Sequence, residues 1–156
     1  MLGHTAKKLE ELLFDWLVYG AVTAYLTSLY GVFQGSLWTF AVMAPLSALM
    51  CYLYLKFYDW SKRDWLGLEA LKRLREGKGL FARLAKLGNV PAFVVLSLQF
   101  DPFVVTVYLR KGSDKYNGYS GRDWMIFWAS VLFANAYWTL RWTLIFELIR
   151  LLWAKT

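Results

Sequence analysis

Asp101 is the ionisable residue whose position most strongly suggests chemistry. It lies in an otherwise uncharged apolar segment that runs from Asn89 to Leu109. A carboxylate in the middle of a membrane helix costs roughly 2.5 to 3.5 kcal/mol, so it persists where it is paired, neutral or hydrated. Pro102 follows it and removes the backbone amide that would bond the Leu98 carbonyl, which predicts a kink. Broken helices of this kind often line binding sites or ion paths.

We therefore predict an intramembrane polar site at this break. Its members are Ser97, Gln99, Asp101, Pro102 and Asn135. By helix rise, Asp101 lies roughly 12 Å from the outer end of its helix and Asn135 roughly 16 Å from the start of the last one. The two side chains are thus expected at matching depth. The simpler alternative is that Asp101 only pins a neighbouring helix within a bundle.

Two further sets of residues are candidates for helix contacts. Asp15 and Arg141 are expected at a similar inner depth, which makes them a candidate charge pair. The alternative for Arg141 is that it snorkels to the inner head groups. Gly20, Ala24 and Ser28 follow one another at spacings of four, a pattern that permits close helix approach.

Residue combinations typical of enzymes are missing from the sequence. The one histidine, His4, lies in the polar N-terminal region, and the one cysteine, Cys51, falls inside a predicted helix. Neither a multi-cysteine metal site nor a glycine-rich phosphate loop is present. Asp59 and Asp64 are surrounded by lysine and arginine, which fits a solvated face better than a metal site. We expect no enzyme, no metal and no cofactor.

The elements that must position these residues follow from composition. The 156 residues are 58% hydrophobic and 19% charged, against about 45 to 50% and about 25% in globular domains. The sequence predicts an all-α polytopic membrane protein with four transmembrane helices, arranged as two hairpins and joined by a basic amphipathic interfacial helix pair. The transmembrane helices are expected at about 12–32, 36–57, 89–109 and 124–146, and the cytoplasmic amphipathic segment at about 59–88, all within one membrane domain of residues 1–156.

Local signals predict where some helices start and stop. A tight turn is expected at Gln34–Ser36, with Ser36 capping the second helix. Capping boxes are expected at Ser61–Asp64 and Ser120–Asp123, since a serine precedes an aspartate by three residues in each. The last helix is expected to continue from Asp123 to Trp153, which is longer than the bilayer requires.

Lysine and arginine counts predict the orientation. If the N-terminus is cytoplasmic, four basic residues fall in outer loops, namely Arg110, Lys111, Lys115 and Arg122, and thirteen fall inside. This excess predicts a multi-pass protein of the cell (inner) membrane with both termini cytoplasmic. The residues expected to contact lipid head groups or partners are Lys62, Arg63, Lys72, Arg73, Arg75, Arg83 and Lys86. The net charge of +7 then suits anionic lipid rather than nucleic acid.

The function expected from these features is that of a non-catalytic integral membrane subunit or scaffold. Its expected partners are the lipid bilayer and either other membrane subunits or further copies of itself. The alternative is a small ion channel or transporter with a midplane polar site around Asp101, Pro102 and Asn135. A third possibility is an effector that permeabilises the membrane when triggered.

Overall fold

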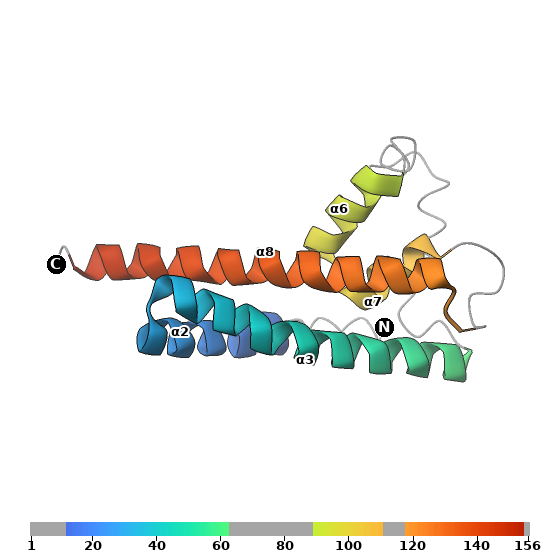
Figure 1. Ribbon diagram of the computed structural model, residues 1–156, viewed down its shortest axis with the longest axis horizontal. Coiled ribbons are helices and arrows are strands. Elements are labelled where there is room, and N and C mark those ends of the chain that lie inside the picture. Colours follow the sequence, from blue (N-terminus) through green and yellow to red (C-terminus); the bar gives the residue numbers. More distant parts are fainter. Residues whose placement is uncertain (1–11, 63–88, 111–117, 155–156) are drawn as a thin grey trace. The chain divides into compact units, whose positions relative to one another are not determined.

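The computed structural model describes residues 12–62, 89–110 and 118–154. Every element among them is a helix, which confirms the all-α class. In chain order they are η1 (Leu12–Val18), α2 (Tyr19–Tyr30), α3 (Val32–Ser61), α6 (Asn89–Gln99), α7 (Pro102–Leu109) and α8 (Gly121–Trp153), as Figure 1 shows. The chain forms two compact units: unit 1 comprises residues 1–46 and 135–156, and unit 2 comprises residues 47–134. The long helices α3 and α8 contribute a part to each.

The turn between α2 and α3 in unit 1 is shorter than predicted. Gly31 alone separates the two helices, with φ 77° and ψ 170°. A positive φ of this kind is costly for any residue with a Cβ, so glycine supplies it. The predicted turn at Gln34–Ser36 is wrong, because Ser36 already lies inside α3 and its hydroxyl donates to the Val32 carbonyl at 2.6 Å.

Gly35 has a packing role instead of a turn role. A Cβ built at Gly35 would lie 2.4 Å from the Thr27 Cα and 2.6 Å from the Leu26 carbonyl oxygen. The two helices of the hairpin therefore meet backbone to backbone at this point. Close approach of this kind is a feature of helix pairs in membranes.

Gly35→Ala should destabilise the hairpin, because backbone rather than a flexible side chain must move to admit the new methyl group. We expect a loss of about 1 to 3 kcal/mol in unfolding free energy, as for other overpacked sites. Gly121→Ala is the control, since its Cβ would meet nothing within 4 Å, and it should change stability by less than about 1 kcal/mol. Thermal unfolding in detergent, followed by circular dichroism, measures both. Equal midpoints for the two variants would contradict a tight backbone contact at Gly35.

Unit 1 has a largely polar interior. Most of its buried side chains are small or carry a polar group; the buried residues include Tyr19, Gly20, Thr23, Thr39, Met43, Ala44, Asn135, Thr139 and Thr143. Large apolar side chains of the same helices are exposed, among them Leu17, Leu29, Leu37, Val42, Leu140 and Leu144. This distribution is the reverse of that in a water-soluble helical bundle.

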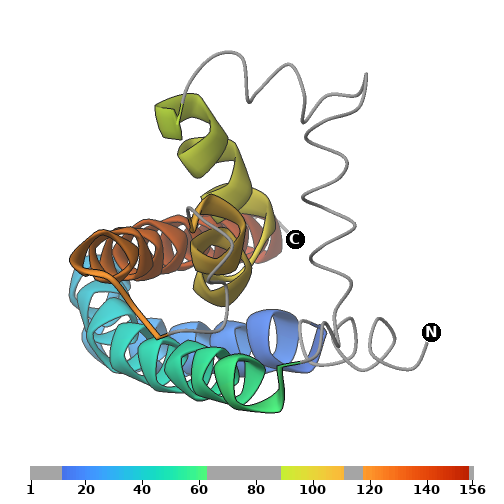
Figure 2. The ribbon, with the colours of Figure 1, turned by 90° about the vertical axis from the view of Figure 1, so that its right-hand side faces the viewer.

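Unit 2 has an apolar interior organised around α7, in which every residue is buried. One cluster joins three helices: Ala48, Cys51, Leu55 and Tyr58 of α3, Phe103, Val104 and Val107 of α7, and Phe127 and Val131 of α8. A second joins Leu96 of α6, Val105, Tyr108 and Leu109 of α7, and Ile126 of α8. Figure 2 looks onto the end where α3 stops and α8 starts, and shows α7 beside the first turns of α8.

The predicted span 89–109 is two helices rather than one. α6 ends at Gln99 and α7 begins at Pro102, and Asp101 between them is extended, with φ −61° and ψ 153°. The break expected at Pro102 is therefore confirmed. The last helix continues to Trp153 as predicted.

One described helix, α3, is long and apolar enough to cross a membrane, with a mean hydropathy of 1.5 over its most apolar window. Only 28% of that window is buried. A core helix of a water-soluble protein would be mostly buried, so the low value favours contact with lipid. One helix therefore supports the expected association with a membrane. This finding does not show the four predicted crossings.

Candidate functional site

The residues of the predicted intramembrane site are divided between the two units. Ser97 is buried in unit 2, where its hydroxyl oxygen lies 3.2 Å from that of Ser130 on α8. Asp101 is half-buried and precedes α7, and Pro102 is the first residue of that helix. The side chain of Gln99 lies outside the described part of the structure.

Asn135 belongs to unit 1, where it contacts Tyr19 of α2. The Tyr19 hydroxyl donates to the Asn135 backbone carbonyl at 2.9 Å and lies 3.3 Å from its side-chain oxygen. The same hydroxyl is 2.8 Å from the Thr139 hydroxyl. The predicted site as a whole thus stays a prediction, while Asn135 has a clear role in joining α2 to α8.

Hydroxyl groups make the other polar contacts of unit 1. Ser36 of α3 and Thr143 of α8 place their hydroxyl oxygens 2.7 Å apart. Thr23 is fully buried and donates to the Tyr19 carbonyl at 2.8 Å. In membrane proteins, hydrogen bonds between helices contribute about 0.6 kcal/mol on average. The bonds that cross between helices here tie both early helices to α8.

Arg141 contacts two tryptophan rings. Its guanidinium carbon lies 4.7 Å from the centre of the Trp16 ring and 4.8 Å from that of Trp138. Both distances are within the range of cation–π attraction. The side chain of Asp15 lies outside the described part, so the Asp15–Arg141 pair remains a prediction. Trp138 lies three residues before Arg141, and this helical spacing could have suggested the contact from sequence.

The small residues of α2 face the last part of α8. A Cβ at Gly20 would lie 3.1 Å from the Trp142 ring, so a larger residue there would require this ring to shift. Ala24 and Ser28 line a pocket of about 330 Å³ against Phe146 and Trp153. Gly20 thus lies against α8, whereas Ala24 and the exposed Ser28 border a pocket, so close helix approach along the whole stripe stays a prediction.

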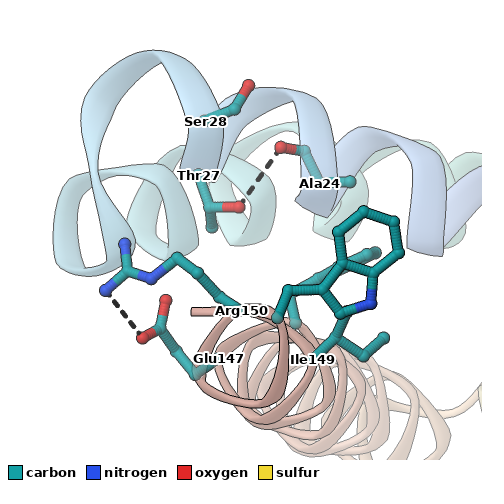
Figure 3. Close-up of a pocket in the computed structure, with 8 residues that line it drawn as sticks. Ala24, Thr27, Ser28, Glu147, Ile149 and Arg150 are labelled. Carbon is teal, nitrogen blue, oxygen red and sulfur yellow. Dashed lines mark hydrogen bonds and ion pairs between the residues drawn. The ribbon is translucent and has the colours of Figure 1, made fainter. Parts of the chain in front are cut away.

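Figure 3 shows that the pocket lies between α2 and the end of α8. The Thr27 and Ser28 hydroxyls donate to carbonyls of their own helix, at 2.7 Å each. Glu147 and Arg150 form an ion pair of 3.1 Å, in which the Arg150 side chain is 70% exposed. The lining thus offers mostly carbon, with an exposed ion pair.

The strongest polar cluster of the described residues surrounds Arg110, the residue that follows α7 in unit 2. Arg110 Nη1 lies 2.9 Å from Asp59 Oδ1, and its Nε lies 3.7 Å from Asp123 Oδ2. The side chains of Arg110, Asp59 and Asp123 are 3%, 13% and 7% exposed. We call these three residues and Tyr119 the Arg110 cluster. It joins the end of α3, the end of α7 and the start of α8.

Tyr119 completes this cluster by placing its ring 5.0 Å from the Arg110 guanidinium. Burial raises the pKa of the Tyr119 phenol far above its ordinary value, and the Asp59 carboxylate raises it further, while the Arg110 cation acts in the opposite direction. The phenol therefore remains neutral at physiological pH. Tyr52 and Trp124 stack beside it, with ring centres 5.8 Å apart.

Asp123 has a second role, at the start of α8. Its backbone amide donates to the Ser120 hydroxyl at 3.2 Å, and its carboxylate accepts from the Ser120 amide at 3.0 Å. The predicted capping box Ser120–Asp123 is thus confirmed. Ser61, in contrast, is the last residue of α3, and Asp64 lies outside the described residues.

The predicted basic surface is described at one residue. Lys62 is exposed, with φ 51°, directly after α3. The other members, namely Arg63, Lys72, Arg73, Arg75, Arg83 and Lys86, fall outside the described residues, as does the rest of the amphipathic segment from 63 to 88. Within residues 12–62, 89–110 and 118–154, no three histidine, cysteine, aspartate or glutamate side chains come together as a possible metal site.

The Arg110 cluster bears on the predicted topology. Two helices crossing the membrane in succession would place Asp59 at the cytoplasmic face and Arg110 at the outer face. The two side chains are in fact in direct contact at 2.9 Å. A direct contact is not expected of residues on opposite faces, so the predicted four crossings stay a prediction that this ion pair does not support.

Comparison of the chain with protein-family models, curated proteins and solved structures finds no match. Its own residues are therefore the basis for any functional proposal.

Arg110→Met should destabilise the protein strongly, because the Asp59 and Asp123 carboxylates would stay buried without their cation. We expect a loss of about 3 to 5 kcal/mol in unfolding free energy. Arg150→Met is the matched control: it breaks the exposed pair with Glu147, which should cost about 0 to 1 kcal/mol. Denaturant unfolding in detergent measures both. Adding Asp59→Asn to the Arg110 variant should restore part of the loss, and equal losses in the two single variants would refute the assignment.

Proposed function

We propose that the protein is a non-catalytic, multi-pass subunit or scaffold of the cell (inner) membrane, which assembles with itself or with other membrane proteins. The observation that carries the proposal is the reversed polarity of the part of α8 that begins at Asn135. Asn135, Thr139 and Thr143 are buried at 2%, 7% and 9% exposure, whereas Leu140, Leu144 and Leu148 are exposed at 59%, 60% and 59%. Each set repeats at intervals of about four residues, so one helix face is polar and buried while another is aliphatic and exposed.

This polarity supports lipid rather than water as the solvent around these helices. In water, leucines at such spacing would be buried and threonines would be exposed, since burial of a leucine side chain contributes about 1.5 to 3 kcal/mol. In lipid there is no such gain, and polar side chains bond to neighbouring helices instead. The same reversal occurs in α2 and in the first part of α3, which supports a membrane position for all three.

The way the polar groups are used supports a scaffold rather than an enzyme. The Tyr19, Ser36 and Thr139 hydroxyls bond across helices, and Arg110 is neutralised by two carboxylates. These groups hold the helices together and leave little reactive functionality in the described part of the chain. Exposed rings such as Trp128, at 51%, are available to lipid or to a partner subunit.

One observation favours a small ion channel or transporter as a second candidate. The α6–α7 break places the half-buried Asp101 between two short helices. Broken helices with polar groups at the break occur in transporters, where they hold ions or polar substrates.

Leu140→Asp tests whether lipid surrounds α8. Leu140 is 59% exposed, so in water the change should alter stability by less than about 0.5 kcal/mol. In a bilayer it should cost roughly 2.5 to 3.5 kcal/mol and reduce membrane insertion. The measurement is the fraction of protein that remains in membranes after an alkaline carbonate wash, with Leu140→Ala as control. Release of the wild-type protein by the wash would contradict the proposal.

Asp101→Asn separates the two candidate functions. For a scaffold we expect no ion or solute flux in liposomes from either the wild type or the variant, and a change in assembly size if Asp101 pins a neighbouring helix. For a channel or transporter, the variant should keep its assembly and lose flux by at least about tenfold, as expected when a charge at the site is removed. Flux by the wild-type protein would therefore overturn the scaffold proposal.

A further inference from the structure

We infer that α6 and α7 form a helix pair that returns to the membrane face from which it started, so that the chain crosses the bilayer three times and its two ends lie on opposite sides. The inference rests on the proposed membrane position of α2, α3 and α8. The juxtaposition that carries it is the contact of Asp59, Arg110 and Asp123.

The Arg110 cluster brings three helix ends to one membrane face. Asp59 lies two residues before the end of α3, Arg110 directly follows α7, and Asp123 lies in the first turn of α8. Buried charges in contact over 2.9 and 3.7 Å are not separated by the thickness of a bilayer. The helices α3 and α7 therefore end, and α8 begins, on the same side.

The sequence between α3 and α6 keeps the start of α6 on that side as well. From Lys62 to Lys86 it contains eight basic residues. Each lysine or arginine in the centre of a bilayer is strongly unfavourable, so this segment does not cross. Since α6 starts and α7 ends on the face where α3 ends, the pair must turn back.

The lengths of the two helices fit such a return. α6 has 11 residues and α7 has 8, which correspond to about 16 Å and 12 Å of helix. Neither alone reaches across a hydrocarbon layer of about 30 Å. The non-helical backbone at Phe100 and Asp101 is tolerated at membrane depth where protein surrounds it, and the adjoining α7 is buried throughout.

The distribution of basic residues supports the three-crossing arrangement independently. With the N-terminus cytoplasmic, the loop after α7 joins the cytoplasmic side, and 15 of the 18 lysine and arginine residues lie there. Arg150 and Lys155 lie outside, and Arg141 lies within α8. The four-crossing arrangement gave thirteen against four, so the new arrangement satisfies the positive-inside tendency better. The resulting basic face is complementary to the anionic head groups of the cytoplasmic leaflet.

Single-cysteine labelling tests the inference on the whole protein in sealed vesicles of known orientation. In a Cys51→Ser background, cysteine is introduced singly by Lys115→Cys, Thr156→Cys or His4→Cys, and a membrane-impermeant maleimide is added from one side. We expect positions 4 and 115 to react from the cytoplasmic side and position 156 from the outer side. The four-crossing arrangement predicts the opposite side for both 115 and 156, so either position reacting that way would overturn the inference.

A second measurement covers the case in which a cysteine variant fails to fold. A reporter fused to the C-terminus of the unmodified chain should be active if it functions only outside the cytoplasm, and a reporter that functions only in the cytoplasm should be inactive there. The reverse pattern would overturn the inference. Release of the protein by carbonate, together with labelling that does not depend on the side, would overturn the membrane proposal as well, which distinguishes the two failures.

Discussion

The ion pair between Arg110 and Asp59 is the interaction on which the arrangement of unit 2 depends. A guanidinium that is 3% exposed is tolerated only when carboxylates neutralise it, and Asp59 and Asp123 do so from two different helices. Because Asp123 also caps α8 through Ser120, the same carboxylate fixes the start of that helix and the end of α7. The cluster therefore couples a local signal, helix capping, to a long-range contact. Removing one charge would affect all three helix ends.

The second constraint is the proposed replacement of water by lipid around the helices. It explains why the interior of unit 1 is made of hydroxyls and small residues. It also explains why α3 has a mean hydropathy of 1.5 over its most apolar window while much of its surface is open. The helix α8 is less apolar overall, since it includes Asn135 and Arg141. Asn135 bonds with Tyr19, and Arg141 lies against two tryptophan rings. Such residues lower the mean hydropathy of α8, although in the folded chain their polar groups contact other side chains.

The sequence predicted the helical class, the break at Pro102, the capping box at Ser120 and the end of α8 at Trp153, because each depends on neighbouring residues. It did not predict the turn at Gly31, because Gln34 to Ser36 have the composition of a turn. The close backbone contact that explains Gly35 depends on the packing of two helices, which the sequence alone does not reveal. The Arg110 cluster was missed for the same reason. Its members are far apart in the chain, and Asp59, judged by its lysine and arginine neighbours, resembled a solvated charge. Within the predicted polar site, Pro102 was placed correctly as a break, while Asn135 bonds with Tyr19 in the other unit.

An apolar segment of about 21 residues is long enough to cross a bilayer, and it is equally long enough to enter and return when it is broken near its middle. Hydropathy cannot distinguish the two courses, because both hide the same side chains. Counts of lysine and arginine distinguish the two courses only weakly, because the four basic residues from Arg110 to Arg122 lie on different sides in the two arrangements. The two courses are distinguished by the partner of Arg110, the first charged residue after the segment. Arg110 pairs with the end of the preceding long helix, so in the proposed three-crossing arrangement the chain reverses at the break before α7 and α8 leads away from the face that collects the basic residues.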